Sequence, residues 1–143
     1  MTDPTSVKVQ WIEGYTFLAS NREGYSILMD ARVNDQDLPM SMSPSQTLLA
    51  SLGGCTGIDI VSILKKMRQD ITGVKIEVTG DRTAGYPKYF QEVDVKYVIE
   101  GRRIQKSAVE KAISLSQEKY CTVSNTINGK AKLHHSYEIV ESP

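Results

Sequence analysis

Residues 43–67 read SPSQTLLASLGGCTGIDIVSILKKM and contain the longest weakly charged stretch of the chain. This segment begins as helices begin: Ser43 suits the N-cap, Pro44 suits the first helical position, and Gln46 lies three residues after the cap. The residues that follow are apolar on most sides, which predicts a central helix covered by protein all round. We expect this helix to end near Asp70.

Three glycines interrupt the predicted helix, at positions 53, 54 and 57. Each glycine costs about 1 kcal/mol relative to alanine in a helix interior. Close approach of another backbone is the usual compensation, so we expect a second helix or a sheet to pack tightly there. The apolar run from Leu48 to Leu64 is slightly short for a membrane span, so it predicts a helix inside protein and no membrane contact.

Patterns on either side of the helix predict one α+β domain over residues 1–143. Alternating apolar and polar residues predict six strands, at residues 6–13, 15–19, 25–29, 74–78, 93–99 and 131–139. A helical period covers residues 105–120 and places Ser116 and Tyr120 on its apolar face, and a further short helix is expected at residues 121–127. The predicted order is βββ-α-ββ-αα-β, with the central helix against an antiparallel sheet.

Composition and charge exclude several classes of protein. The 143 residues include 17 Lys and Arg and 17 Asp and Glu, so the formal charge is zero and no nucleic-acid partner is expected. Two cysteines are too few for a disulfide-rich secreted scaffold. The N-terminus MTDPTSVKVQ has neither a basic region nor an apolar stretch, which predicts a cytoplasmic location.

The two cysteines, Cys55 and Cys121, are the candidate reactive groups. Small neighbours surround Cys55, and Asp59 follows it on the same helical face, where a carboxylate raises the pKa of a thiol unless a cation lies nearby. Cys121 begins the predicted short helix, whose N-terminal dipole is expected to lower the thiol pKa. Their spacing fits neither a metal knuckle nor a Cys-x-x-Cys motif, so residue patterns alone leave open a redox pair or two inert thiols.

The two histidines are adjacent, at positions 134 and 135. Neighbouring residues of a strand point to opposite faces, so the pair is not expected to bind one metal. His135 shares the apolar face of the predicted last strand, which predicts a hydrogen-bonded histidine in the core.

Two segments resemble the OsmC/Ohr family, named for osmotically inducible protein C and organic hydroperoxide resistance protein. Residues 43–55 are similar to its first-cysteine helix, and residues 118–127, EKYCTVSNTI, to its second-cysteine segment. Thr122 stands where that segment usually has proline. The stretch from Gly53 to Leu64 most resembles the YhfA-like branch of the family, and the resemblance covers nearly the whole chain.

The resemblance implies a fold, an assembly and an activity. The fold is an intertwined homodimer with two central helices at its core, and the active site forms at the subunit interface. The implied activity is reduction of organic hydroperoxides, defending the cell against oxidative stress. Cys55 is the implied peroxidatic cysteine and Cys121 the implied resolving cysteine, which together form a disulfide that a dithiol reductant reopens. The family chemistry uses neither a metal nor another cofactor.

Two departures from the family pattern bear on the activity. Ser45 stands where the hydroperoxide resistance proteins have a glutamate, and no arginine follows Gly14, although in the family that arginine and glutamate hold and activate the thiolate. Cys55 must then find another cation, for which Arg22 and Arg32 are the candidates, or be less reactive. A second hypothesis is therefore a non-enzymatic thiol sensor or a binder of small apolar ligands, and a third is an interaction domain with inert thiols.

Overall fold

The computed structural model describes residues 4–143. The chain divides into two compact units, with the boundary between Leu48 and Leu49. The elements follow the predicted order βββ-α-ββ-αα-β, with one additional π-helical turn between the last two helices. The α+β fold class is thereby confirmed.

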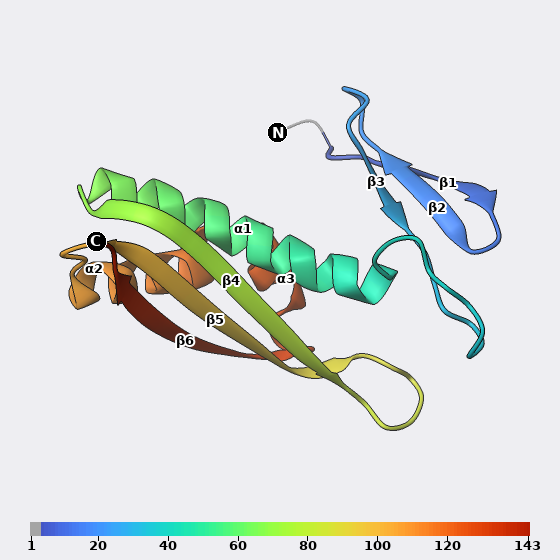
Figure 1. The fold of residues 1–143 in the computed structure, drawn as a ribbon. Helices are drawn as coiled ribbons and strands as arrows, with labels where there is room; N and C mark the ends of the chain where they lie inside the picture. The colour runs from blue at the N-terminus through green and yellow to red at the C-terminus, as the bar shows by residue number, and fades with distance from the viewer. Residues whose placement is uncertain (1–3) are drawn as a thin grey trace. The chain divides into compact units, whose positions relative to one another are not determined.

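The first unit contains a three-stranded antiparallel sheet with the order β1-β2-β3 (Figure 1). Its strands are β1 (Lys8–Glu13), β2 (Thr16–Ser20) and β3 (Ser26–Met29). Gly14 and Gly24 lie in the two turns with φ angles of +52° and +88°, which glycine adopts more easily than other residues. Every residue of β1 is exposed, so the described part of this unit does not bury the apolar side chains of that strand.

A buried carboxylate, Asp30, organises the loop that follows β3. Its oxygens accept hydrogen bonds from the backbone N–H of Ala31 at 2.7 Å, the backbone N–H of Met40 at 3.0 Å and Thr16 Oγ1 at 3.2 Å. The two backbone donors, Met40 first, lower the pKa of Asp30. The charged carboxylate therefore fastens both ends of the loop to strand β2.

The main helix, α1 (Pro44–Lys66), begins with the predicted capping box. Ser43 Oγ accepts from the backbone N–H of Gln46 at 3.1 Å, and Gln46 Oε1 accepts from the backbone N–H of Ser43 at 2.9 Å. The helix ends before the expected Asp70, because Arg68 takes a left-handed φ of 58° that turns the chain into the next strand.

The second unit contains a mixed sheet with the order β4-β5-β6. Strand β4 (Asp70–Arg82) pairs antiparallel with β5 (Phe90–Arg102), whereas β5 pairs parallel with β6 (Lys132–Glu141). The prediction of an antiparallel sheet is therefore wrong for the pair β5 and β6. The reason is that the helices between β5 and β6 form a crossover, which returns the chain in the same direction.

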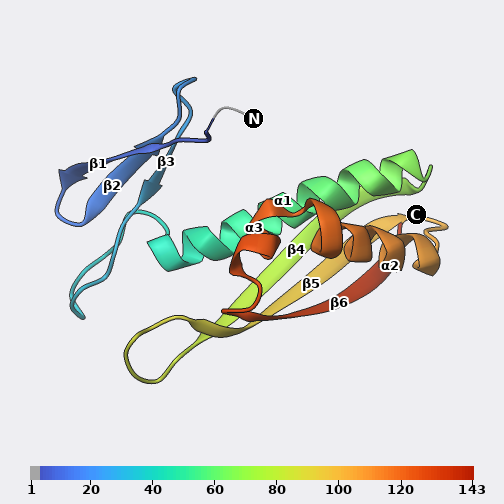
Figure 2. The same cartoon turned by 180° about the vertical axis from the view of Figure 1, so that it is seen from behind.

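Three further helical segments form this crossover: α2 (Lys106–Leu115), the π-helical turn η1 (Ser116–Tyr120) and α3 (Thr122–Ile127). Together with α1 they lie on one face of the sheet, as the two opposite views show (Figures 1 and 2). The wider π turn moves Tyr120 off the predicted apolar face, and this side chain is 56% exposed. The core between helices and sheet consists of Leu52, Ile60, Leu64, Val93, Val95, Tyr97, Ile99, Ala108, Val109, Ala112, Ile113, Cys121 and Ala131.

Two of the three glycines in α1 pack closely on strand β4. A Cβ atom added at Gly53 would lie 3.2 Å from Val78 Cγ2, and one at Gly57 would lie 3.4 Å from Ile76 Cγ1. The predicted close approach is confirmed at these two positions. Gly54 differs, because an added Cβ would have no neighbour within 4 Å.

Part of α1 is not covered by the second unit, whereas the sequence predicted a helix covered all round. Ile58 is 73% exposed and Leu48 is 42% exposed. By length and composition alone the helix is apolar enough to cross a membrane, and only 28% of its most apolar window is buried. The apolar surface of α1 is therefore larger than the area that the second unit covers.

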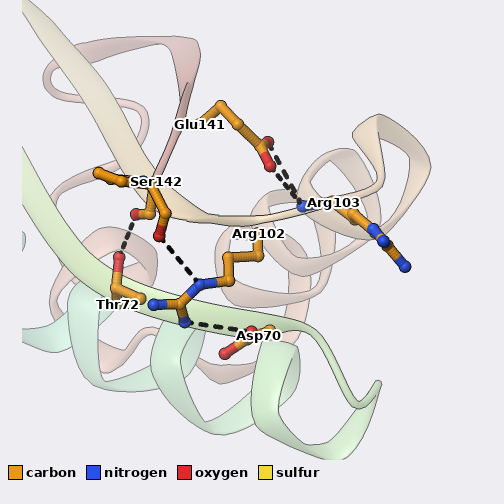
Figure 3. A network of polar contacts seen from close by, with 7 residues as sticks. Asp70, Thr72, Arg102, Arg103, Glu141 and Ser142 are labelled. Atoms are coloured by element: carbon orange, nitrogen blue, oxygen red, sulfur yellow. Dashed lines mark hydrogen bonds and ion pairs between the residues drawn. The ribbon is translucent and has the colours of Figure 1, made fainter.

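Polar contacts fasten the end of β6 to the neighbouring strands (Figure 3). Arg102 Nη1 lies 3.3 Å from Asp70 Oδ2, and the hydroxyls of Thr72 and Ser142 lie 2.5 Å apart. The Glu141 carboxylate accepts from the backbone N–H of the residue after Arg102 at 3.1 Å. The ends of all three strands of this sheet are thus joined.

The capping box gives a first testable prediction. Replacing Ser43 by alanine leaves the N–H of Gln46 without its acceptor, so we expect the free energy of unfolding to fall by about 1 kcal/mol. Urea denaturation measures this change. Ser45→Ala, two residues along the same turn, is the matched control and should change the value by less than about 0.5 kcal/mol. Equal effects of the two substitutions would contradict a specific role of the cap.

Candidate functional site

The structure brings the two predicted cysteines together. Cys55 lies on α1 and is half-buried, whereas Cys121 precedes α3 and is fully buried. Both are free thiols, and the Cys55 thiol acts directly on the pKa of Cys121, which places the two side chains close together. Residues that are far apart in the sequence thus form one thiol pair, at the helix face packed on the core.

The π-helical turn and the start of α3 position Cys121. The backbone N–H of Cys121 donates to the carbonyl of Ser116 at 2.7 Å, which closes the π turn. Cys121 then takes an extended conformation as the N-cap of α3, and its Sγ accepts from the backbone N–H of Ser124 at 3.3 Å. The sulfur therefore occupies the place of a capping oxygen and is held by the backbone.

Burial dominates the acidity of Cys121 and raises its pKa to about 11. The N–H of Ser124 acts in the opposite direction, while the Cys55 thiol and the Asp59 carboxylate raise the pKa further. The predicted lowering by the helix dipole is wrong, because the cost of desolvating a thiolate is larger than the gain from one backbone donor. At neutral pH Cys121 is a thiol.

A network of hydroxyl groups lies beside the thiol pair. Thr56 is fully buried on α1, one residue after Cys55, and its Oγ1 lies 2.8 Å from Ser116 Oγ and 3.1 Å from Tyr97 OH. Ser116 Oγ donates to Asp59 Oδ2 at 2.8 Å. The hydroxyls of a helix, a strand and the π turn thus connect to one half-buried carboxylate.

Two further side chains extend this network. Gln117 Nε2 donates to Thr56 Oγ1 at 3.1 Å and to Tyr97 OH at 2.9 Å, and its Oε1 accepts from the Ser124 hydroxyl. His135 Nδ1 lies 3.2 Å from Tyr97 OH. His135 has the predicted hydrogen bond but is exposed, so it is not the core histidine that the sequence predicted, because β6 is an edge strand of its sheet. Desolvation of its ring nevertheless lowers the pKa of His135.

Sequence reasoning missed the network residues Thr56, Tyr97, Ser116 and Gln117. Three of them are polar groups at positions where periodicity predicts burial, and a buried polar group requires a hydrogen-bond partner. That signal shows that partners exist. It does not identify them, because the contacts join residues up to 61 positions apart.

The predicted activating cations lie in the first unit, whereas Cys55 belongs to the second. Arg32 donates to the backbone carbonyls of Asn34 at 3.3 Å and Asp35 at 2.7 Å, so it is held within its own loop. Arg22 is exposed. Their role beside the thiol stays a prediction. Within residues 4–143, no three His, Cys, Asp or Glu side chains cluster as a metal site would require.

Comparisons with known proteins show the family and the fold. The model of the family described as OsmC-like protein matches residues 35–136. Protein YhfA of Escherichia coli K12 is 38% identical over 133 residues, which cover 93% of this chain and 96% of that protein. A hypothetical protein from Aquifex aeolicus VF5 has a crystal structure with a TM-score of 0.87 and 30% identity, covering 99% of this chain and 100% of that one.

A more distant structure shares the fold. It is described as an organic hydroperoxide resistance protein OsmC, predicted redox protein and regulator of sulfide bond formation, from Legionella pneumophila. Its TM-score is 0.66 at 16% identity, over 96% of this chain and 98% of that one.

The burial of Cys121 predicts how this thiol ionises. In the single-thiol variant Cys55→Ser, the thiolate absorbance should appear well above the ordinary cysteine pKa of about 8.5. Adding Asp59→Asn removes a negative charge, so the pKa of Cys121 should fall. An ultraviolet pH titration measures both values. Asp94→Asn, which changes an exposed carboxylate on β5, is the control and should leave the pKa of Cys121 unchanged. If Asp94→Asn lowered this pKa as much as Asp59→Asn does, a specific effect of Asp59 on Cys121 would be excluded.

Proposed function

Because the chain belongs to the OsmC-like protein family, we propose that it is a thiol-dependent peroxidase that reduces organic hydroperoxides in defence against peroxide stress. The observation that carries the proposal is the proximity of the thiols of Cys55 and Cys121. Proximity of the two sulfur atoms is the first requirement for a disulfide, and two thiols that are far apart in a structure do not meet it.

The unequal burial of the two thiols supports unequal roles. Cys55 is half-buried and so remains within reach of a substrate, whereas Cys121 is fully buried and protonated at neutral pH. We therefore assign Cys55 as the nucleophile that cleaves the O–O bond, which releases an alcohol and leaves a sulfenic acid on Cys55. Cys121 then condenses with the sulfenic acid, so that water leaves and the disulfide forms.

The disulfide must be reopened for a second turnover. A dithiol reductant suits this step, because its first thiol attacks one sulfur of the disulfide and its second thiol closes the reductant's own ring. The half-buried Cys55 sulfur is the accessible end for that attack. The cytoplasmic location, where cellular reductants keep thiols reduced, belongs to the same proposal.

A homodimer is the proposed assembly. Large apolar side chains are exposed on the first sheet, among them Trp11 at 64%, Tyr25 at 77% and Ile27 at 53%, and Ile58 on α1 is exposed at 73%. An isolated three-stranded sheet needs a covered apolar face for stability, and contiguous exposed apolar surface marks an interaction site. A second copy of this chain, with the same apolar faces, is the proposed partner.

A second candidate function is a non-enzymatic thiol sensor or a small apolar-ligand binder. Ser45 in place of a glutamate and Tyr15 after Gly14 in place of an arginine favour it, since the chain lacks two groups that would activate Cys55. Such a protein would form the same disulfide, but slowly and without efficient turnover.

The peroxidase proposal predicts a rapid change in mass. One equivalent of cumene hydroperoxide should remove two hydrogens from the reduced protein, and Cys55→Ser should lower turnover with a dithiol at least about a hundredfold. Cys121→Ser should stop at a sulfenic acid that dimedone traps. Quenched intact-mass spectrometry follows these species. Turnover that survives Cys55→Ser would exclude the mechanism, and a disulfide that forms only over hours would favour the sensor.

The dimer proposal predicts a solution mass of about twice the 15.9 kDa chain mass. A charge on the exposed apolar sheet should weaken the assembly, so Ile27→Glu should shift the protein toward the monomer. Tyr86→Glu, on the exposed loop between β4 and β5, is the control and should leave the dimer intact. Light scattering after size-exclusion chromatography distinguishes the two, and a monomeric parent protein would refute this assembly.

A further inference from the structure

Five side chains connect the surface to the region of the thiol pair in an unbroken series of hydrogen bonds. The series begins at the exposed His135, passes through Tyr97, Thr56 and Ser116, and ends at Asp59. Its four contacts measure 3.2, 3.1, 2.8 and 2.8 Å in that order. Asp59 and Cys55 are four residues apart on α1, so they share a helical face.

The carboxylate of Asp59 fixes the direction of its nearest hydrogen bonds. A carboxylate only accepts, so the single proton of the Ser116 hydroxyl points to Asp59. Ser116 Oγ must then accept its other bond, which makes Thr56 the donor at 2.8 Å. The proton of Thr56 is thereby used, and its oxygen must accept from every other neighbour.

The same reasoning extends to the surface. Because the proton of Thr56 is already donated to Ser116, Thr56 Oγ1 accepts from both Gln117 Nε2 and Tyr97 OH. The phenol proton of Tyr97 is now used, so the contact with His135 requires Nδ1–H of the imidazole as donor. Gln117 fits this pattern, because its amide donates to both oxygens and its carbonyl accepts from Ser124. Every donor in the series thus points from His135 toward Asp59.

We propose that His135, Tyr97, Thr56, Ser116 and Asp59 form a directional proton relay, which carries a proton from the surface to the carboxylate beside the thiol pair. The proposal rests on the peroxidase function and adds to it. A proton that binds Nε2 of His135 displaces the Nδ1 proton to Tyr97, and successive transfers through the hydroxyls end with Asp59 protonated. Ser116, Thr56 and Tyr97 act as positioning residues in this relay.

The proposed reaction requires one proton for each turnover. A thiolate on Cys55, a thiol on Cys121 and one hydroperoxide give a disulfide, an alcohol and a water only if one further proton enters the site. Asp59 is the acid on the same helical face as Cys55, and its charge reaches Cys121. Protonated Asp59 supplies the proton to the oxygen leaving group, and the relay replaces that proton from solvent.

Other titratable groups interact with the two ends of the relay through their charge or lie next to them in the chain. At the outer end, His134 is adjacent to His135 and pairs with Glu92. At the inner end, Cys121 and Tyr97 interact with the charge of Asp59. Burial raises the pKa of Tyr97, so its phenol keeps the proton that the relay requires.

The direction of the relay is testable in the reduced resting protein. Nitrogen-15 NMR should find His135 protonated at Nδ1 in the parent protein. Ser116→Ala removes the link to Asp59. Thr56 is then free to donate to Tyr97, and Tyr97 is free to donate to His135. The imidazole proton of His135 should therefore move from Nδ1 to Nε2. Ser116 does not touch His135, so loss of local packing alone does not predict this change. Ser114→Ala, on the exposed side of α2, removes only the bond to Glu118 and should leave the Nδ1 tautomer in place.

Proton delivery is tested by the rate of disulfide formation with cumene hydroperoxide, measured by quenched intact mass. Ser116→Ala should slow it about tenfold, within the range of proton-transfer catalysis, whereas Ser114→Ala should stay within about twofold. If the parent protein reacts and both variants react equally, the relay is refuted and the peroxidase stands. If the parent forms no disulfide, the peroxidase proposal and proton delivery fail together. An Nε2 tautomer in the parent refutes the hydrogen-bond direction in either case.

Discussion

The close packing of α1 on strand β4 is the constraint on which the rest of the second unit depends. The helix approaches the strand at Gly53, where an added Cβ atom would lie only 3.2 Å from Val78 Cγ2, and at Gly57, where it would lie 3.4 Å from Ile76 Cγ1. This approach explains why glycine is kept inside a helix despite a cost of about 1 kcal/mol for each residue. It also places Cys55, Thr56 and Asp59, which lie between and beside the glycines, against the core.

Burial then differentiates two thiols that the sequence leaves equivalent. Cys121 receives a backbone hydrogen bond at the start of a short helix, an arrangement that elsewhere activates cysteines. Helix-terminus effects at such sites amount to about 0.3–1 kcal/mol, less than one pKa unit, whereas burial of an ionisable group shifts its pKa by as much as about 3–5 units. Desolvation therefore prevails, and Cys121 is held as a thiol close to the more accessible Cys55.

The polar groups in the core are accommodated because they satisfy one another. Thr56 and Ser116 are fully buried, yet both hydroxyls have partners, and the series of hydrogen bonds ends at a carboxylate and at an exposed imidazole. A buried hydroxyl without a partner costs about 1–3 kcal/mol. The network therefore fixes how α1, β5 and the π turn fit together, and the same contacts align protons in one direction beside the thiols.

The sequence by itself determined the features that depend on neighbouring residues. The capping box at Ser43, the strand alternation and the short helix after Cys121 all follow from contacts within a few positions, and the structure contains them. Family motifs around the cysteines further identified the fold. Only the tertiary structure decided that β5 and β6 run parallel, that a π turn exposes Tyr120, and that His135 meets Tyr97 at the surface. These features depend on distant segments competing for the same space and the same hydrogen-bond partners, and local periodicity does not record that competition.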